Sequence, residues 1–184
     1  MQAVFLGLFA ALIVAADQIT KYLTVMNILP SAKTELVGRL VEAYGMTGEQ
    51  LVGLPSKVDA IPGVFSFVHV LNEGAAWSSF SGMQWLFALI FVLFTVAVVW
   101  EYRKRFMGFT TFEWWCIAAI YGGGLGNMID RLRMGFVVDM IQLEFMNFPV
   151  FNVADCFISC GCIALIVHMV FFNKTFWKDG KQQK

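Results

Sequence analysis

Long apolar runs separated by shorter polar segments are the main feature of this chain. A helix that crosses a bilayer needs about 20 mostly apolar residues to span roughly 30 Å of hydrocarbon. The pattern therefore predicts an all-α membrane protein with four transmembrane helices, formed by a single membrane domain over residues 1–184. The predicted spans are at about residues 3–27, 83–100, 112–130 and 152–173.

Two polar segments are predicted to lie together on the outer side of the membrane. The first, residues 28–82, contains prolines and glycines that favour turns. Residues 64–71 of this segment alternate apolar and polar side chains, which is typical of a short strand. We expect a small β-rich extracytoplasmic element in this first outer loop. The second segment, residues 131–150, is predicted to be a short outer loop.

Composition supports a membrane location, and the basic residues orient the chain. The chain is 59% hydrophobic and only 14% charged, whereas roughly a quarter of the residues in a soluble domain are charged. Lys and Arg gather at 103–105 and in the tail after residue 173, and basic residues in short loops stay cytoplasmic. Both termini are therefore predicted to be cytoplasmic. The 13 basic and 13 acidic residues give no argument for a nucleic-acid partner.

Cysteine and histidine do not form a metal-binding pattern in this sequence. The four cysteines lie inside apolar runs, where a thiol packs as a small apolar side chain. The two histidines are far apart, and no pair of cysteines has the spacing of zinc ligands. We expect no disulfide framework, no metal and no cofactor.

Carboxylates in or beside the predicted spans are the strongest functional signal, because ionisable groups in a membrane are costly and rare. Asp17, Asp130, Asp139 and Asp155 are all predicted to lie near the outer leaflet. Asp139 and Asp155 lie in apolar segments, where two adjacent negative charges are disfavoured. One carboxyl would keep its proton while the other stays ionised, which lets an aspartic pair activate water. We therefore expect these two residues to be catalytic.

A structural role is the alternative for each of these acids, because membrane carboxylates also pair with a buried Lys or Arg. Asp17 and Lys21 are four residues apart, which places them on one helix face, so we predict a structural pair. Asp130 is followed directly by Arg131, which could neutralise it or bind another group. Asp130 is therefore also assigned a structural role. The two predicted catalytic acids have no such basic neighbour in the sequence.

Four short motifs follow one another along the chain. They are DQITK at 17–21, NEGAAW at 72–77, GNMIDR with GFVVD at 126–139, and FNVAD at 151–155. These resemble the motifs D-Q-x-x-K, N-x-G-x-A-F, G-N-x-x-D-R-x-x-x-G-x-V-x-D and F-N-x-A-D of the bacterial lipoprotein signal peptidases, the signal peptidase II family. Each motif alone is moderately specific, whereas four in this order on these spans are strongly specific.

The resemblance implies an aspartic endopeptidase of the bacterial inner membrane with its active site near the outer leaflet. Substrates of this family are prolipoproteins whose Cys already carries diacylglycerol, and cleavage falls just before that Cys. Asp139 and Asp155 match the catalytic pair of the family. We also expect a monomer among membrane lipids that is inhibited by the cyclic peptide globomycin. The positions that match substrate-contacting residues of the family are Asn72, Gly74, Asn127, Arg131 and Asn152.

Two departures from the family pattern and two other functions remain open. Trp77 stands where the motif has Phe, and the loop at about 30–66 is longer than is typical. The acids could instead line a relay in a proton-coupled or ion-conducting protein, although they gather at one side of the bilayer. Lys21 could also activate Ser78 or Ser79, although a neighbouring carboxylate would keep it protonated.

Overall fold

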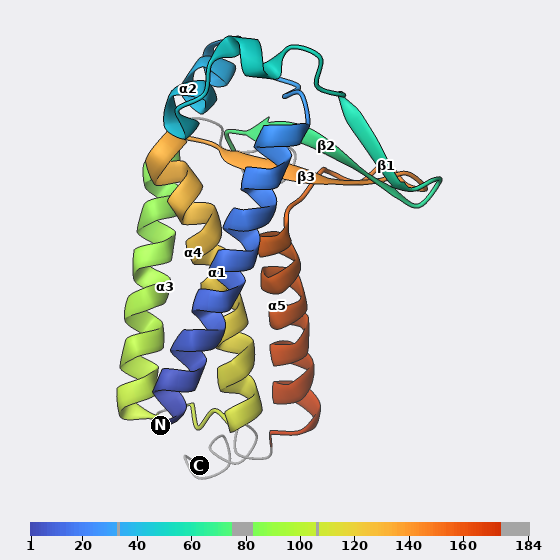
Figure 1. Ribbon diagram of the computed structural model, residues 1–184. Helices are drawn as coiled ribbons and strands as arrows, with labels where there is room; N and C mark the ends of the chain where they lie inside the picture. Colours follow the sequence, from blue (N-terminus) through green and yellow to red (C-terminus); the bar gives the residue numbers. More distant parts are fainter. Residues whose placement is uncertain (33, 75–82, 106, 174–184) are drawn as a thin grey trace.

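A bundle of long helices carries a small sheet at one end (Figure 1). The computed structural model describes residues 1–32, 34–74, 83–105 and 107–173. In Figure 1 the start of α1 and the end of α5 lie at the same end of the bundle, opposite the sheet. Within the described residues, each long helix lies over one predicted apolar run. These helices are α1 (Gln2–Asn27), α3 (Gln84–Lys104), α4 (Thr111–Met134) and α5 (Val153–Phe171).

Three of these helices, α1, α3 and α5, are long and apolar enough to cross a membrane, counting only the described part of the chain. The fourth, α4, is 24 residues long but more polar, since it contains glycines, Asn127 and several charged side chains. It packs against the other three helices, and most of its central side chains are buried by protein. A helix covered in this way needs less apolar surface than one that faces lipid.

Glycines on α4 allow the neighbouring helices to approach its backbone closely. A Cβ atom added at Gly122 would lie 2.9 Å from the carbonyl oxygen of Ala10 in α1. At Gly123 it would lie 2.5 Å from the carbonyl oxygen of Ala154 in α5. Because both obstacles are backbone atoms, any side chain at these positions would push the helices apart.

The sheet has three antiparallel strands, in the order β1 (Lys57–Ile61), β2 (Phe65–Asn72) and β3 (Val137–Leu143). The strand predicted at 64–71 is confirmed as β2. Both β1 and β2 come from the segment between α1 and α3, where a β element was expected, whereas β3 comes from the segment between α4 and α5. Residues 136–140 are all buried, so they lack the alternation that reveals a half-exposed strand. Pairing of β2 with β3 brings the first loop to Asp139.

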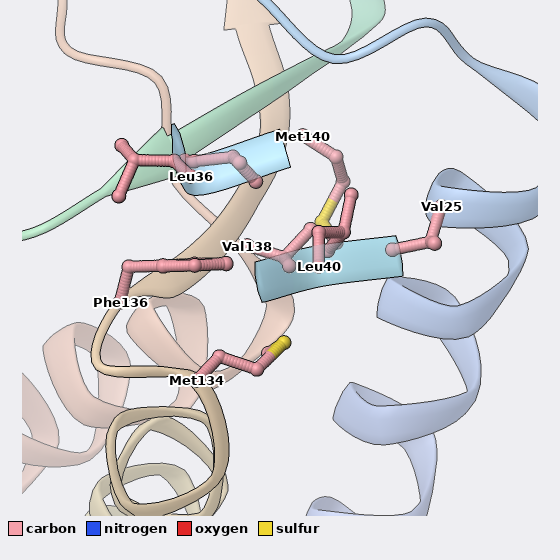
Figure 2. Close-up of a cluster of buried hydrophobic side chains, with 8 residues drawn as sticks. Val25, Leu36, Leu40, Met134, Phe136, Val138 and Met140 are labelled. Carbon is pink, nitrogen blue, oxygen red and sulfur yellow. The ribbon is translucent and has the colours of Figure 1, made fainter. Parts of the chain in front are cut away.

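The segment between α1 and α3 also contains a helix, α2 (Thr34–Tyr44), which was not predicted from the sequence. Leu36 and Leu40, one turn apart, point from α2 into a buried apolar cluster (Figure 2). The cluster includes Val138 and Met140, which flank Asp139 on β3. The helix therefore supports the strand that carries this carboxylate. The full cluster comprises Val25, Leu36, Leu40, Leu71, Met134, Phe136, Val138 and Met140.

Candidate active site

The start of α5 is built by a reciprocal cap that places Asp155. Asn152 is the N-cap residue, and its side-chain oxygen accepts a hydrogen bond of 3.0 Å from the backbone N–H of Asp155. The Asp155 carboxylate in turn accepts a bond of 3.1 Å from the backbone N–H of Asn152. This exchange is the capping box, which satisfies helix N–H groups that lack an intrahelical partner. The spacing of Asn and Asp in FNVAD therefore follows from the geometry of a helix start.

Asp139 lies on β3 and is nearly excluded from water, with 2% of its surface exposed. Its two carboxylate oxygens accept hydrogen bonds from Asn152 Nδ2 at 2.7 Å and from Asn72 Nδ2 at 2.9 Å. Burial, followed by the nearby charge of Asp155, raises the pKa of Asp139 to about 7. Near neutral pH, Asp139 can therefore hold or release a proton.

Asn152 connects the two predicted catalytic carboxylates. Its side-chain amide donates to Asp139, and its backbone N–H donates to Asp155. Both acids also line one cavity of about 750 Å³ between α3, α4, α5 and β3. Most of the remaining wall is apolar and includes Phe91, Phe94 and Ile158. The site is thus a pair of acids set into the wall of an apolar cavity.

Asn127 on α4 connects this pair to a buried charge cluster. Its Nδ2 donates to Asp155 Oδ1 at 2.8 Å. Its Oδ1 accepts from Asn152 Nδ2 at 3.0 Å and from Lys21 Nζ at 2.9 Å. With donors on one side and an acceptor on the other, the amide can take only one orientation. Lys21 therefore holds Asn127 in the position that supports Asp155.

The charge cluster consists of Asp17, Lys21 and Asp130, each with 0% exposure. Lys21 Nζ lies 2.8 Å from a carboxylate oxygen of Asp17 and 2.8 Å from one of Asp130. Asp17 also accepts a bond of 3.0 Å from the backbone N–H of Ala154, at the start of α5. Lys21 is thus the basic residue that pairs with Asp130, whereas Arg131, which follows Asp130 in the sequence, lines the cavity. The cluster joins α1, α4 and α5 and contacts the site through Asn127.

Arg131 points toward the cavity that the two carboxylates line. Its Nη2 donates to the carbonyl oxygen of Gly74 at 2.9 Å, and its Nη1 donates to that of Asn127 at 3.2 Å. Its guanidinium group lies 4.4 Å from the centre of the Phe87 ring, a distance at which a cation and an aromatic face attract. Arg131 therefore holds Gly74, which follows the end of β2, beside the site.

The structure brings all ten site residues expected from the sequence into two adjoining groups. Those around the cavity are Asn72, Gly74, Asn127, Arg131, Asp139, Asn152 and Asp155, of which all but Asn152 line it directly. The second group is the buried charge cluster. Trp77 is the departure from the family motif, and Ser78 and Ser79 are the nucleophiles of the serine-lysine alternative. All three lie outside the described residues.

Comparisons with known proteins identify the family to which this chain belongs. The family model described as "Signal peptidase (SPase) II" matches residues 9–171. The chain belongs to the signal peptidase II family. A lipoprotein signal peptidase from Enterococcus faecalis is 36% identical over 95% of this chain and 92% of its own length. One from Lactococcus lactis is 43% identical over 62% of this chain and 75% of its own length.

Two solved structures of bacterial membrane enzymes are similar to this member of the signal peptidase II family. Each is 28% identical to it, and their TM-scores are 0.67 and 0.65. The first comparison covers 90% of this chain and 92% of the other, and the second covers 96% and 90%. The likeness therefore extends over the helices, the sheet and the site together.

Two residues of the site lie within the signal peptidase II motifs but received no role in the sequence analysis. Gln18 Nε2 donates to Asp130 Oδ1 at 2.9 Å and to the carbonyl oxygen of Gly126 at 3.2 Å. Gly126 leaves room for the charge cluster, because a Cβ atom there would lie 2.6 Å from Asp17 Oδ2. The signal in the sequence for these two positions was that the family motifs specify Gln at position 18 and Gly at position 126.

Proposed function

We propose that this chain is an intramembrane aspartic endopeptidase that removes signal peptides from diacylglyceryl prolipoproteins. The cut falls just before the lipid-modified Cys. The observation that supports this most directly is the pair Asp139 and Asp155, which share Asn152 as a hydrogen-bond donor and line one apolar cavity. An apolar cavity beside two acids suits a peptide bond attached to a hydrocarbon-bearing side chain.

The reaction uses the two carboxyl groups in different protonation states. Asp139, with its raised pKa, carries the proton, and Asp155 acts as the carboxylate base. Asp155 takes a proton from the attacking water, while Asp139 donates its proton toward the substrate carbonyl oxygen. As the tetrahedral intermediate collapses, Asp155 gives the proton that it took from water to the leaving amine, and Asp139 takes back a proton from a hydroxyl group of the intermediate. The amide of Asn152 stays bonded to Asp139 and preserves its orientation.

The proposed placement has four spans, because α4 has 24 residues and would extend about 36 Å. Both termini would be cytoplasmic, with the sheet and α2 on the outer surface of a bacterial inner membrane. Exposed tryptophans support this position, since Trp85 and Trp100 lie toward opposite ends of α3, with exposed fractions of 64% and 56%. Tryptophan side chains favour membrane interfaces. The chain would act as a monomer among lipids.

Cleavage of a purified diacylglyceryl prolipoprotein in detergent micelles tests this function. We expect one cut before the lipid-modified Cys, and globomycin should inhibit it by occupying the cavity. The matched control is the same prolipoprotein without diacylglycerol, which should be cleaved far more slowly because it lacks the hydrocarbon that fills the apolar wall. Mass spectrometry of the products locates the cut. Equal cleavage of both substrates, or a cut elsewhere, would contradict the proposal.

The proposed proton on Asp139 predicts a pH dependence. Because the folded-state pKa of Asp139 is raised to about 7, its protonated form is lost as pH rises through that value. We expect kcat/KM to fall about tenfold per pH unit above the apparent pKa of the pair. The measurement is kcat/KM between pH 5 and 9, with tryptophan fluorescence as a control for unfolding. A rate that stays constant up to pH 9 would show that Asp139 does not act as the proton donor.

A further inference from the structure

A second groove lies at the other end of the bundle from the site. It has a volume of about 380 Å³ and runs between the start of α1, the end of α3 and the start of α4. In Figure 1 these three helix ends lie together, away from the sheet. Its lining includes Gly7 and Ala11 of α1, Arg103 of α3, and Trp114 and Ile117 of α4.

The wall of this groove is suited to hydrocarbon and not to water. On the α1 side it is lined by small residues, and a Cβ atom added at Gly7 would meet nothing within 4 Å. Trp114 and Ile117 of α4 are buried and lie on its opposite side. A water molecule needs two to four polar partners to be held in a cavity, and this wall is almost entirely apolar. In a bilayer, an acyl chain is the occupant that gives these walls their contacts.

The charge beside the groove is positive. Arg103 lines it, and Lys104 and Arg105 follow in the sequence, all three exposed. The two acids in the described part of this end are buried and engaged. Glu101, 6% exposed, accepts a bond of 2.9 Å from the backbone N–H of Met107. Glu113, 0% exposed, accepts from the backbone N–H of Thr110 at 2.7 Å and from Asn173.

We infer that this groove binds an anionic phospholipid of the bilayer. One acyl chain lies between α1 and α3, and the phosphate lies against Arg103. The acyl chain alone would be accepted from any phospholipid, because the walls are apolar. Selection for an anionic head group comes mainly from Arg103, because it lines the groove, and one basic residue beside the phosphate contributes about a fivefold gain in affinity for an anionic lipid. The inference rests on the membrane placement of α1 and α3 and not on the peptidase activity.

Native mass spectrometry of the purified full chain, released from detergent micelles, tests this site. Phosphatidylglycerol and phosphatidylcholine with the same acyl chains are titrated separately, and the dissociation constant of the first bound lipid is measured. We expect tighter binding of phosphatidylglycerol. Arg103→Gln should weaken that binding about fivefold and leave phosphatidylcholine unchanged. The matched control is Lys104→Gln, which removes an equal charge from a residue that does not line the groove and should have the smaller effect.

A second variant tests the groove itself. Gly7→Leu places a side chain in the open space, and we expect it to displace the first bound lipid of either kind. Ala11→Leu serves the same purpose if the Gly7 variant does not fold. Glycerol phosphate, which has the phosphate without acyl chains, should not compete. Equal affinity for the two lipids in the wild-type chain, or unchanged binding in Arg103→Gln and in the filled variants, would overturn the inference.

Discussion

Asp139→Asn and Asp155→Asn should each reduce cleavage of a diacylglyceryl prolipoprotein by on the order of 10³-fold to 10⁴-fold. Asparagine keeps the shape of the side chain but can neither release a proton as an acid nor take one from water. In the proposed reaction each carboxyl group has one of these tasks, so neither can replace the other. The measurement is kcat/KM for the purified variants under the conditions of the wild-type assay.

The double variant and a distant carboxylate provide the controls. Because the two acids act as a unit, Asp139→Asn with Asp155→Asn should be no less active than either single variant. Glu144→Gln removes a carboxylate at the far end of β3, where it pairs with Lys57 at 2.7 Å, and should leave activity nearly unchanged. Activity near the wild-type level in either single variant would remove that residue from the reaction.

Loss of folding is not expected to explain the effect of Asp139→Asn. The folded protein raises the pKa of Asp139 to about 7, well above its ordinary value of 3.8. Ionised Asp139 is therefore disfavoured in the folded state, and the stability of the wild-type protein decreases as pH rises from about 4 to about 7, between the unfolded and folded pKa values of this group. An uncharged amide avoids this loss, although it offers only one acceptor oxygen to the two amides that donate to Asp139. Because these two effects oppose each other, we expect the variant to stay folded at pH 8, as measured by thermal unfolding.

The long helices could be predicted from the sequence because lipid imposes a simple rule on them. A helix such as α3 or α5, exposed along most of its length, must present apolar side chains continuously. The strand β2 was also predictable, since residues 64–71 alternate apolar and polar side chains, although its polar Ser66 and His69 are buried. Both patterns lie within a single element, so they can be found without knowledge of its partners.

Features that depend on tertiary partners could not be predicted in the same way. The sequence suggested Arg131 as the partner of Asp130 because the two are adjacent. Successive side chains on a helix point about 100° apart, so Asp130 faces Lys21 of α1 while Arg131 faces the cavity. The double role of Asn152 likewise requires β3 to lie against the start of α5. Only the packed structure supplies these distances.

Lys21→Met should cause the largest loss of stability of any single change near the site. The Lys21 ammonium group is fully buried and lies 2.8 Å from both Asp17 and Asp130. Removing it leaves two buried carboxylates without their cation, which destabilises a protein by about 3 to 5 kcal/mol. Asn127 also loses one of the two donors to its side-chain oxygen, so its support of Asp155 should weaken. Chemical unfolding in detergent and the cleavage assay measure the two effects.

Replacing Asp17 and Asp130 by neutral residues separates the effect of Lys21 on stability from its effect on the position of Asn127. Replacing a whole buried ion cluster by uncharged groups is often nearly neutral for stability, whereas removing one member is not. Lys21→Met combined with Asp17→Asn and Asp130→Asn should therefore recover much of the lost stability. Activity should stay low in this triple variant, because Asn127 still lacks the hydrogen bond from Lys21. Lys104→Met, at an exposed position far from the site, is the control for loss of a lysine. A Lys21→Met protein as stable as the wild type would show that Lys21 does not neutralise the two acids.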